Sequence, residues 1–99
     1  MLGKFPALIS TLIVPQIRIT CPGSPGHGSM FLGNTAGEKA QFMINKLLAY
    51  RQQEKARLEA DPTKTLGDVT TVNLTIMEGG VQTNVVPDKY FLISGKLMF

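Results

Sequence analysis

The sequence has few of the residues from which metal sites and disulfides are built. Its 99 residues include one cysteine, Cys21, one histidine, His27, and no tryptophan. A single cysteine cannot form an internal disulfide, which favours a reducing, cytoplasmic compartment. A zinc site takes three or four ligands, and its histidines and cysteines cluster at short spacings. We therefore expect no metal ion or other cofactor to be bound by this chain itself.

Charge of either sign is also sparse. The formal net charge is +3, and charged residues make up 17% of the chain against 43% for hydrophobic ones. This balance is typical of a single globular domain and does not indicate a nucleic-acid partner. The basic residues of one segment are interpreted as a solvated helix face, with binding of duplex DNA or an acidic partner as the weaker alternative. They are Lys46, Arg51, Lys55 and Arg57.

No hydrophobic run is long enough to span a membrane, so no membrane partner is expected. The run Phe5–Val14 follows Lys4 and has the outline of a signal peptide, but Pro6 interrupts it and no small-x-small cleavage site precedes Gln16. The alternatives are a buried strand or the remnant of a preceding exon. Residues 1–15 are predicted to be an N-terminal extension.

The first regular element expected after this extension is a strand. Gln16–Cys21 alternates polar and apolar residues, as half-buried strands do. Pro22–Ser29 is rich in proline and glycine, so it is predicted to be a loop without regular structure.

A long helix is predicted to begin after Thr35. Thr35 and Glu38 have the spacing of a capping box, in which each side chain satisfies a free backbone amide. Apolar residues then recur at steps of three and four and form one stripe. They are Ala36, Ala40, Met43, Ile44, Leu47 and Leu48. In the charged segment that follows, Glu54 and Arg57 are spaced to pair, and the helix is expected to continue as a solvated extension until Asp61 precedes a proline.

Two strands are predicted beyond the helix. Val69–Met77 alternates and is rich in β-branched residues. Its apolar face is expected to consist of Val72, Leu74 and Ile76. Two glycines after Glu78 predict a hairpin turn, with Val81–Val86 as the returning strand. Tyr90–Ile93 could form a further short strand.

The order strand, long helix, strand, strand predicts an α+β fold. A right-handed crossover makes the first two strands parallel neighbours, and the hairpin adds an antiparallel third strand. This is the first half of a ferredoxin-like (split βαβ) sandwich, which requires a second helix and a fourth strand. Too little chain follows Asp88 to form both. An incomplete ferredoxin-like fold with an unpaired sheet edge is therefore expected.

Two segments carry a resemblance to a known family. They are Ile19–Glu54, which contains the loop GSPGHGS, and Val69–Pro87, which contains EGGVQTNVVP. Both resemble the dimerisation (lid) domain of the aminoacylase-type di-zinc metallopeptidases. Residues 16–90 are accordingly predicted to be a partial dimerisation domain of this family, and residues 91–99 an unmatched C-terminal tail.

The resemblance implies a split active site. In this family a separate catalytic domain holds two zinc ions, and the histidine of the PGH loop reaches across the dimer to stabilise the oxyanion formed during amide hydrolysis. His27 matches that histidine, Gly26 and Gly28 would let the loop approach a ligand closely, and Asn84 is similar in position to a substrate-binding asparagine. Judged by residue type alone, His27 remains an ordinary loop histidine and Asn84 a polar strand residue.

The function implied is that of the lid segment of an N-acyl-L-amino-acid amidohydrolase of amino-acid metabolism, with zinc in the parent enzyme. The family's zinc ligands and its substrate-gripping arginine have no counterpart here, so the chain is expected to be inactive alone. A truncated product, an alternative transcript or an incomplete gene model would each explain this. The expected partner is a second copy or a full-length aminoacylase subunit. The alternative function is a non-catalytic interaction module that pairs with such subunits.

Overall fold

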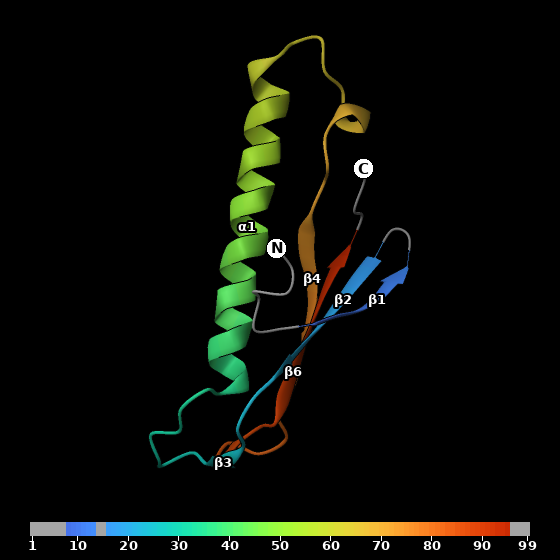
Figure 1. Ribbon diagram of the computed structural model, residues 1–99. Coiled ribbons are helices and arrows are strands. Elements are labelled where there is room, and N and C mark those ends of the chain that lie inside the picture. The colour runs from blue at the N-terminus through green and yellow to red at the C-terminus, as the bar shows by residue number, and fades with distance from the viewer. Residues whose placement is uncertain (1–7, 14–15, 96–99) are drawn as a thin grey trace.

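The computed structural model describes residues 8–13 and 16–95. One long helix covers one face of a four-stranded sheet, and a two-stranded sheet lies at one end of the molecule (Figure 1). The remaining residues of the predicted N-terminal extension, 1–7 and 14–15, lie outside the described residues. So do residues 96–99 of the predicted tail.

The four-stranded sheet has the strand order β1-β2-β6-β4, and every neighbouring pair is antiparallel. The strands are β1 (Leu8–Ile13), β2 (Gln16–Pro22), β4 (Asn73–Glu78) and β6 (Lys89–Gly95). The predicted α+β, incomplete ferredoxin-like class is confirmed. The prediction that the two strands flanking the helix are neighbours is wrong, because β6 lies between β2 and β4. The crossover is therefore a split one.

The fourth strand of the sheet comes from upstream of β2. β1 pairs with β2 from Leu8 opposite Thr20 to Ile13 opposite Gln16. In a complete βαββαβ fold the last strand lies beside the first. β1 occupies that position here. Of the interpretations of the N-terminal hydrophobic run, the structure therefore supports a strand, over residues 8–13.

The strand that returns from β4 is β6, so the predicted hairpin is wrong. β4 pairs with β6 from Asn73 opposite Gly95 to Glu78 opposite Phe91. Gly79 and Gly80 do end β4, with φ of 150° and 86°, values that favour glycine. The chain then makes an excursion before it re-enters the sheet at Lys89. The predicted short strand at Tyr90–Ile93 is confirmed, because it lies within β6.

Only a small part of the predicted returning strand is regular. β5 (Val85–Val86) pairs with β3 (Gly26–His27) and not with β4. The prediction that Pro22–Ser29 has no regular structure is therefore also wrong, since β3 lies within it. Each of these strands has only two residues, too few to show an alternating pattern. Their pairing joins two loops that are distant in the sequence, so it depends on the tertiary structure.

The long helix has the predicted bounds. α1 (Ala36–Ala60) begins at a capping box, in which the Glu38 amide donates to Thr35 Oγ1 (3.2 Å) and the Thr35 amide donates to Glu38 Oε1 (3.1 Å). The helix ends at Asp61, the residue before proline.

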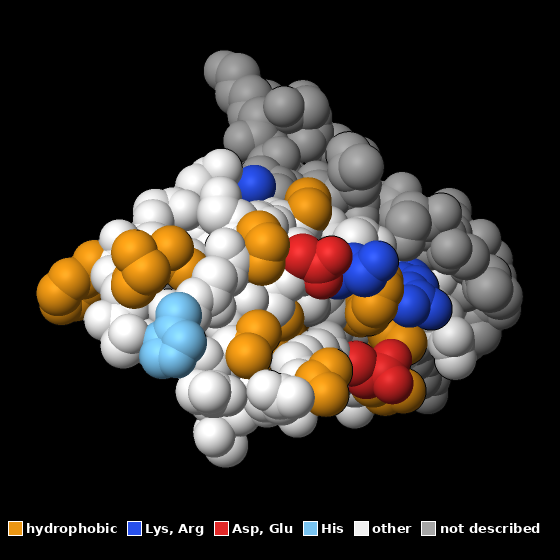
Figure 2. Space-filling model, turned by 90° about the horizontal axis from the view of Figure 1, so that it is seen from below, with side chains coloured by type: hydrophobic (Ala, Val, Ile, Leu, Met, Phe, Trp, Pro, Cys, Tyr) orange, Lys and Arg blue, Asp and Glu red, His pale blue; other side chains and the backbone are white. Residues whose placement is uncertain are grey.

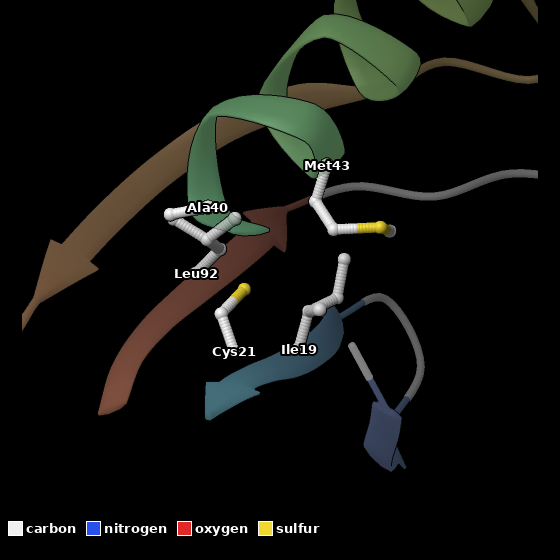
Figure 3. Packing of buried hydrophobic residues seen from close by; sticks show 5 residues of the cluster. All are labelled: Ile19, Cys21, Ala40, Met43 and Leu92. Atoms are coloured by element: carbon white, nitrogen blue, oxygen red, sulfur yellow. The ribbon is translucent and has the colours of Figure 1, made fainter. Parts of the chain in front are cut away.

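The core lies between α1 and the sheet (Figure 3). It consists of Ile19, Cys21, Ala40, Met43 and Leu92. The predicted apolar stripe is confirmed except at Leu48, which is 47% exposed. Burial raises the pKa of the Cys21 thiol, which agrees with the role of this residue as a small packing group.

A β-bulge in β4 overturns the predicted apolar face of that strand. Leu74 is opposite Ser94 but Ile76 is opposite Ile93, so Thr75 is the extra residue. Strict alternation would place Leu74 and Ile76 on one face. Instead Leu74 packs against the core and Ile76 lies on the other face, 46% exposed.

Glu54 is buried, although the sequence indicates a solvated helix at this position. Its side chain accepts hydrogen bonds from Arg57 Nη1 (2.6 and 2.8 Å) and from the backbone amide of Thr70 (2.8 Å). The predicted pairing of Glu54 with Arg57 is confirmed. The bond to Thr70 ties the second half of α1 to the segment that leads into β4.

These bonds make the stability of the fold depend on pH. The hydrogen bonds from Arg57 and from the Thr70 amide lower the pKa of the Glu54 carboxyl in the folded chain. The pKa of a glutamate in the unfolded chain is about 4.3. The ionised carboxylate therefore stabilises the fold above about pH 4.3, and this contribution is lost as the pH falls through the lower folded-state pKa. Urea unfolding measured between pH 7 and pH 3 is expected to show that loss. The variant Glu54→Gln is expected to remove part of the pH dependence of the free energy of unfolding.

The matched control is Glu59→Gln, on the exposed side of the same helix and 4.0 Å from Lys55. At pH 7 Glu54→Gln should lower the free energy of unfolding clearly more than Glu59→Gln does. Equal effects of the two variants would contradict a structural role for Glu54.

Candidate functional site

The candidate site lies on the small sheet at the end of the molecule (Figure 1). In this sheet Gly26 is opposite Val86 and His27 is opposite Val85. Two further backbone bonds flank the pair, from the Gly23 amide to the Asp88 carbonyl (2.8 Å) and from the Gly28 amide to the Asn84 carbonyl (2.8 Å). Residues 23–28 and 84–88 therefore lie side by side. We refer to these two segments as the tip sheet.

The tip sheet brings all four predicted site residues into one small region. His27 is opposite the residue that follows Asn84, and Gly28 is bonded to Asn84 itself. A Cβ on Gly28 would lie 3.3 Å from the carbonyl carbon and oxygen of Asn84, so this glycine lets the two segments approach closely. Residues 57 positions apart in the sequence are thus adjacent.

Gly26 has a packing role within the loop. A Cβ at this position would lie 2.7 Å from Cδ1 of Leu32 and 3.1 Å from its Cδ2. The absence of a side chain at Gly26 therefore lets the chain fold back over itself between His27 and α1. This packing role was not predicted from the sequence, which indicated only that a glycine here would let the loop approach a ligand closely.

The imidazole of His27 is exposed and is held from one side. Its Nδ1 atom lies 2.7 Å from Ser29 Oγ and 3.2 Å from the backbone nitrogen of Ser29. The Met30 amide donates to the His27 carbonyl (3.1 Å) and closes a turn over residues 27–30. Ser29 was missed by the sequence reasoning. The only signal for it was its place two residues after the histidine.

Exposed apolar side chains surround this region. Figure 2 views the molecule from the end that carries the tip sheet, with the one histidine at the surface among hydrophobic side chains. The large apolar residues exposed within residues 26–34 and 79–86 are Met30, Phe31, Val81 and Val85. Exposed apolar groups gathered around a polar one are typical of a surface that another protein or a ligand covers. We call His27, Asn84 and these four residues the tip surface.

The described residues offer neither a metal site nor a membrane-spanning helix. Within 8–13 and 16–95, no three side chains of His, Cys, Asp or Glu are grouped so that they could hold a metal ion. The donor set around His27, one imidazole and one hydroxyl, does not fit zinc. The one long helix in this part of the chain is too polar to cross a bilayer.

Comparisons with known proteins point to one family. Residues 16–93 match the family model of the peptidase dimerisation domain. Aminoacylase-1 of Sus scrofa is 54% identical over 71 residues, or 72% of this chain and 17% of the relative. Aminoacylase-1 of Homo sapiens is 48% identical over the same length, and that of Dictyostelium discoideum is 44% identical over 68 residues. The chain thus spans about 17% of the length of the curated relatives that it matches.

Proposed function

This chain belongs to the peptidase dimerisation domain family, and on that premise we propose that it is the dimerisation and lid segment of an aminoacylase-like N-acyl-L-amino-acid amidohydrolase. Identities of 44–54% with aminoacylase-1 from distant organisms support this parent enzyme. The one observation that carries the proposal is the exposed His27, held by hydrogen bonds on the tip sheet beside Asn84.

In this proposal His27 acts on a substrate held by another polypeptide. As the family resemblance implies, the catalytic zinc in this proposal is held by a separate catalytic domain of the parent enzyme, and the donors around His27 are not assigned to it. A hydrogen-bond donor aimed at the negative charge that develops on an amide oxygen contributes about 10²–10³ in rate where water is excluded. The apolar residues of the tip surface would exclude water when they are covered. Asn84 would contact the substrate with its side-chain amide.

The surface proposed for pairing is one of the two outer edges of the large sheet, that of β4. β4 is an outer strand, so one row of its backbone amides and carbonyls has no partner strand in the described sheet. Met77 is 60% exposed and Ile76 is 46% exposed, on opposite faces of this edge. A second copy, or a full-length aminoacylase subunit, could extend the sheet here through a two-fold interface. We also propose a reducing, cytoplasmic site of action, since Cys21 is a buried free thiol.

The pairing surface is tested by charge substitutions at the edge. The combined variant Ile76→Lys and Met77→Lys is expected to weaken self-association at least about tenfold, because it places desolvated like charges against each other. Sedimentation equilibrium measures the dissociation constant. The control is Leu66→Lys, at an apolar residue of similar exposure (61%) in the short helix Leu66–Asp68. A strictly monomeric wild-type chain that also fails to bind Sus scrofa aminoacylase-1 would rule the proposal out.

A second candidate function is a non-catalytic interaction module that binds full-length subunits and modulates them. The free edge of β4 favours it independently of His27. The two functions differ in one result. A pure interaction module would bind a subunit but would never restore its activity.

A further inference from the structure

The turn that carries His27 places two groups of Ser29 on one atom of the imidazole. Ser29 Oγ lies 2.7 Å from His27 Nδ1, and the Ser29 backbone nitrogen lies 3.2 Å from the same atom. The bond from the Met30 amide to the His27 carbonyl closes the turn around them. Nδ1 thus takes the position that a side-chain oxygen of Asp or Asn takes in an Asx turn.

The chemistry of these groups determines the tautomer of the ring. A backbone amide can only donate a hydrogen bond, so Nδ1 must be the acceptor. In a neutral imidazole one nitrogen accepts and the other carries the proton, so the proton is on Nε2. The Ser29 hydroxyl then donates to Nδ1 as well. An imidazole protonated at Nδ1 would direct its N–H against the Ser29 amide, which cannot accept.

We infer that Ser29 is a positioning residue, which holds the neutral form of the His27 ring in the tautomer with its proton on Nε2 and limits rotation of the ring. Within the described residues Nε2–H has no hydrogen-bond partner, so the donor is left available to an anionic group outside this chain. This inference rests on the proposed function, in which such a group is the developing oxyanion of an amide substrate. The opposite tautomer would present a lone pair to the oxyanion and repel it.

The backbone of the turn supports the same geometry. His27 is paired with Val85, and the next residue, Gly28, donates to the Asn84 carbonyl. The imidazole is therefore attached to a main chain that is bonded on both sides of it, and Ser29 removes the remaining freedom of the side chain. A group held by its neighbours loses little entropy when it binds an oxyanion.

The presence of one histidine makes the tautomer directly measurable. Labelling the 99-residue chain with ¹⁵N-histidine marks only His27, and the ring nitrogen signals of the neutral form report which nitrogen carries the proton. The wild-type chain is expected to be protonated at Nε2. Ser29→Ala retains the amide but loses the hydroxyl, so the ratio of Nδ1–H to Nε2–H tautomer should rise about two- to tenfold, the effect of one hydrogen bond.

Two further variants make the experiment decisive. Ser29→Thr restores a hydroxyl and should restore the wild-type ratio, whereas Ser24→Ala removes an exposed hydroxyl of the same loop and should leave it unchanged. A proton on Nδ1 in the wild-type chain, or the same ratio in Ser29→Ala as in Ser24→Ala, would overturn the inference. The measurement needs no substrate or subunit, so its failure is distinguishable from a failure of the proposed function, which appears only as lost activity.

Discussion

In a complementation experiment, this chain is expected to restore amide hydrolysis to a full-length subunit that lacks its own oxyanion-stabilising histidine. Replacing His27 by alanine is expected to lower the restored activity about 10²–10³-fold. The subunit is Sus scrofa aminoacylase-1 in which the PGH-loop histidine, the residue that the family resemblance matches to His27, has been replaced. It is co-expressed and co-purified with the 99-residue chain. Pairs of the two polypeptides would contain one intact site, with His27 supplied by this chain. The measurement is kcat for release of acetate from N-acetylmethionine.

The reason for this size is the loss of a single well-placed donor. Removing one such group typically costs about 2.7–4 kcal/mol of transition-state stabilisation, because the developing negative charge is then left without a partner in a site that excludes water. His27 is exposed, so its replacement leaves the core of Ile19, Cys21 and Leu92 untouched. Binding of the subunit and the fold should therefore both survive the substitution, and the loss should fall on kcat.

Ser24→Ala in the same loop is the control for that experiment and should restore activity as the wild-type chain does. Two results would contradict the proposal. One is wild-type chain that binds the defective subunit but restores nothing, which would favour the interaction module. The other is zinc-dependent hydrolysis of N-acetylmethionine by the chain alone, because the described residues contain no group of side chains that could hold the metal.

Leu92→Ala is expected to lower the free energy of unfolding by about 2–5 kcal/mol. Leu92 is fully buried on β6, one of the two inner strands of the large sheet, where it faces Ala40 of α1 (Figure 3). Truncation removes apolar contacts on both sides of the core and leaves a cavity that a rigid sheet cannot close. A chain of this size has a total stability on the order of 5–15 kcal/mol. Urea unfolding at one fixed protein concentration measures the change, since pairing also stabilises the fold.

Ser94→Ala provides a matched control, because Ser94 lies on the same strand and the same face and is equally buried. In the described part of the chain its Oγ atom has no hydrogen-bond partner. Removing a buried hydroxyl that is already unsatisfied should leave the stability unchanged or raise it. A loss in Ser94→Ala as large as that in Leu92→Ala would show that the core at β6 tolerates no change of volume, and would contradict this explanation.

The features that were predicted correctly from the sequence depend on residues close to one another in the chain. The capping box at Thr35 and Glu38 and the proline after Asp61 define α1, because these signals act within one helical turn. The pattern of Gln16–Cys21 predicted β2 to within one residue, since alternation directly reports which side chains are buried. The pairing of Glu54 with Arg57 was predicted for the same reason, as both lie on one turn of the helix.

The features that were missed depend on partners distant in the sequence. A bulge at Thr75 reverses the face of Ile76, and no local pattern marks it. The burial of Glu54 depends on the Thr70 amide, which only the packing of the connector against α1 brings near. β5 is two residues long and exists because β3 lies beside it.

The candidate site divides in the same way. His27 and Asn84 were found through a family resemblance carried by the letters of two loops, and their proposed roles stay predictions. Their proximity follows from the bond between Gly28 and the Asn84 carbonyl, and the contact of Ser29 with Nδ1 follows from the turn over residues 27–30. Neither could be predicted, because a hydrogen bond depends on distances of tenths of an ångström that composition and periodicity do not specify.

By itself, the sequence determined the helix and its ends, the strand β2, a short part of β6, the α+β class and the family. The tertiary structure alone decided that β6 lies between β2 and β4, that β1 completes the sheet, and that His27, Asn84 and Ser29 meet on one tip. The physical reason is that caps and amphipathic patterns act over a few residues of chain. The order of strands and the assembly of a site depend on which distant surfaces bury the most apolar area and satisfy the most backbone groups together.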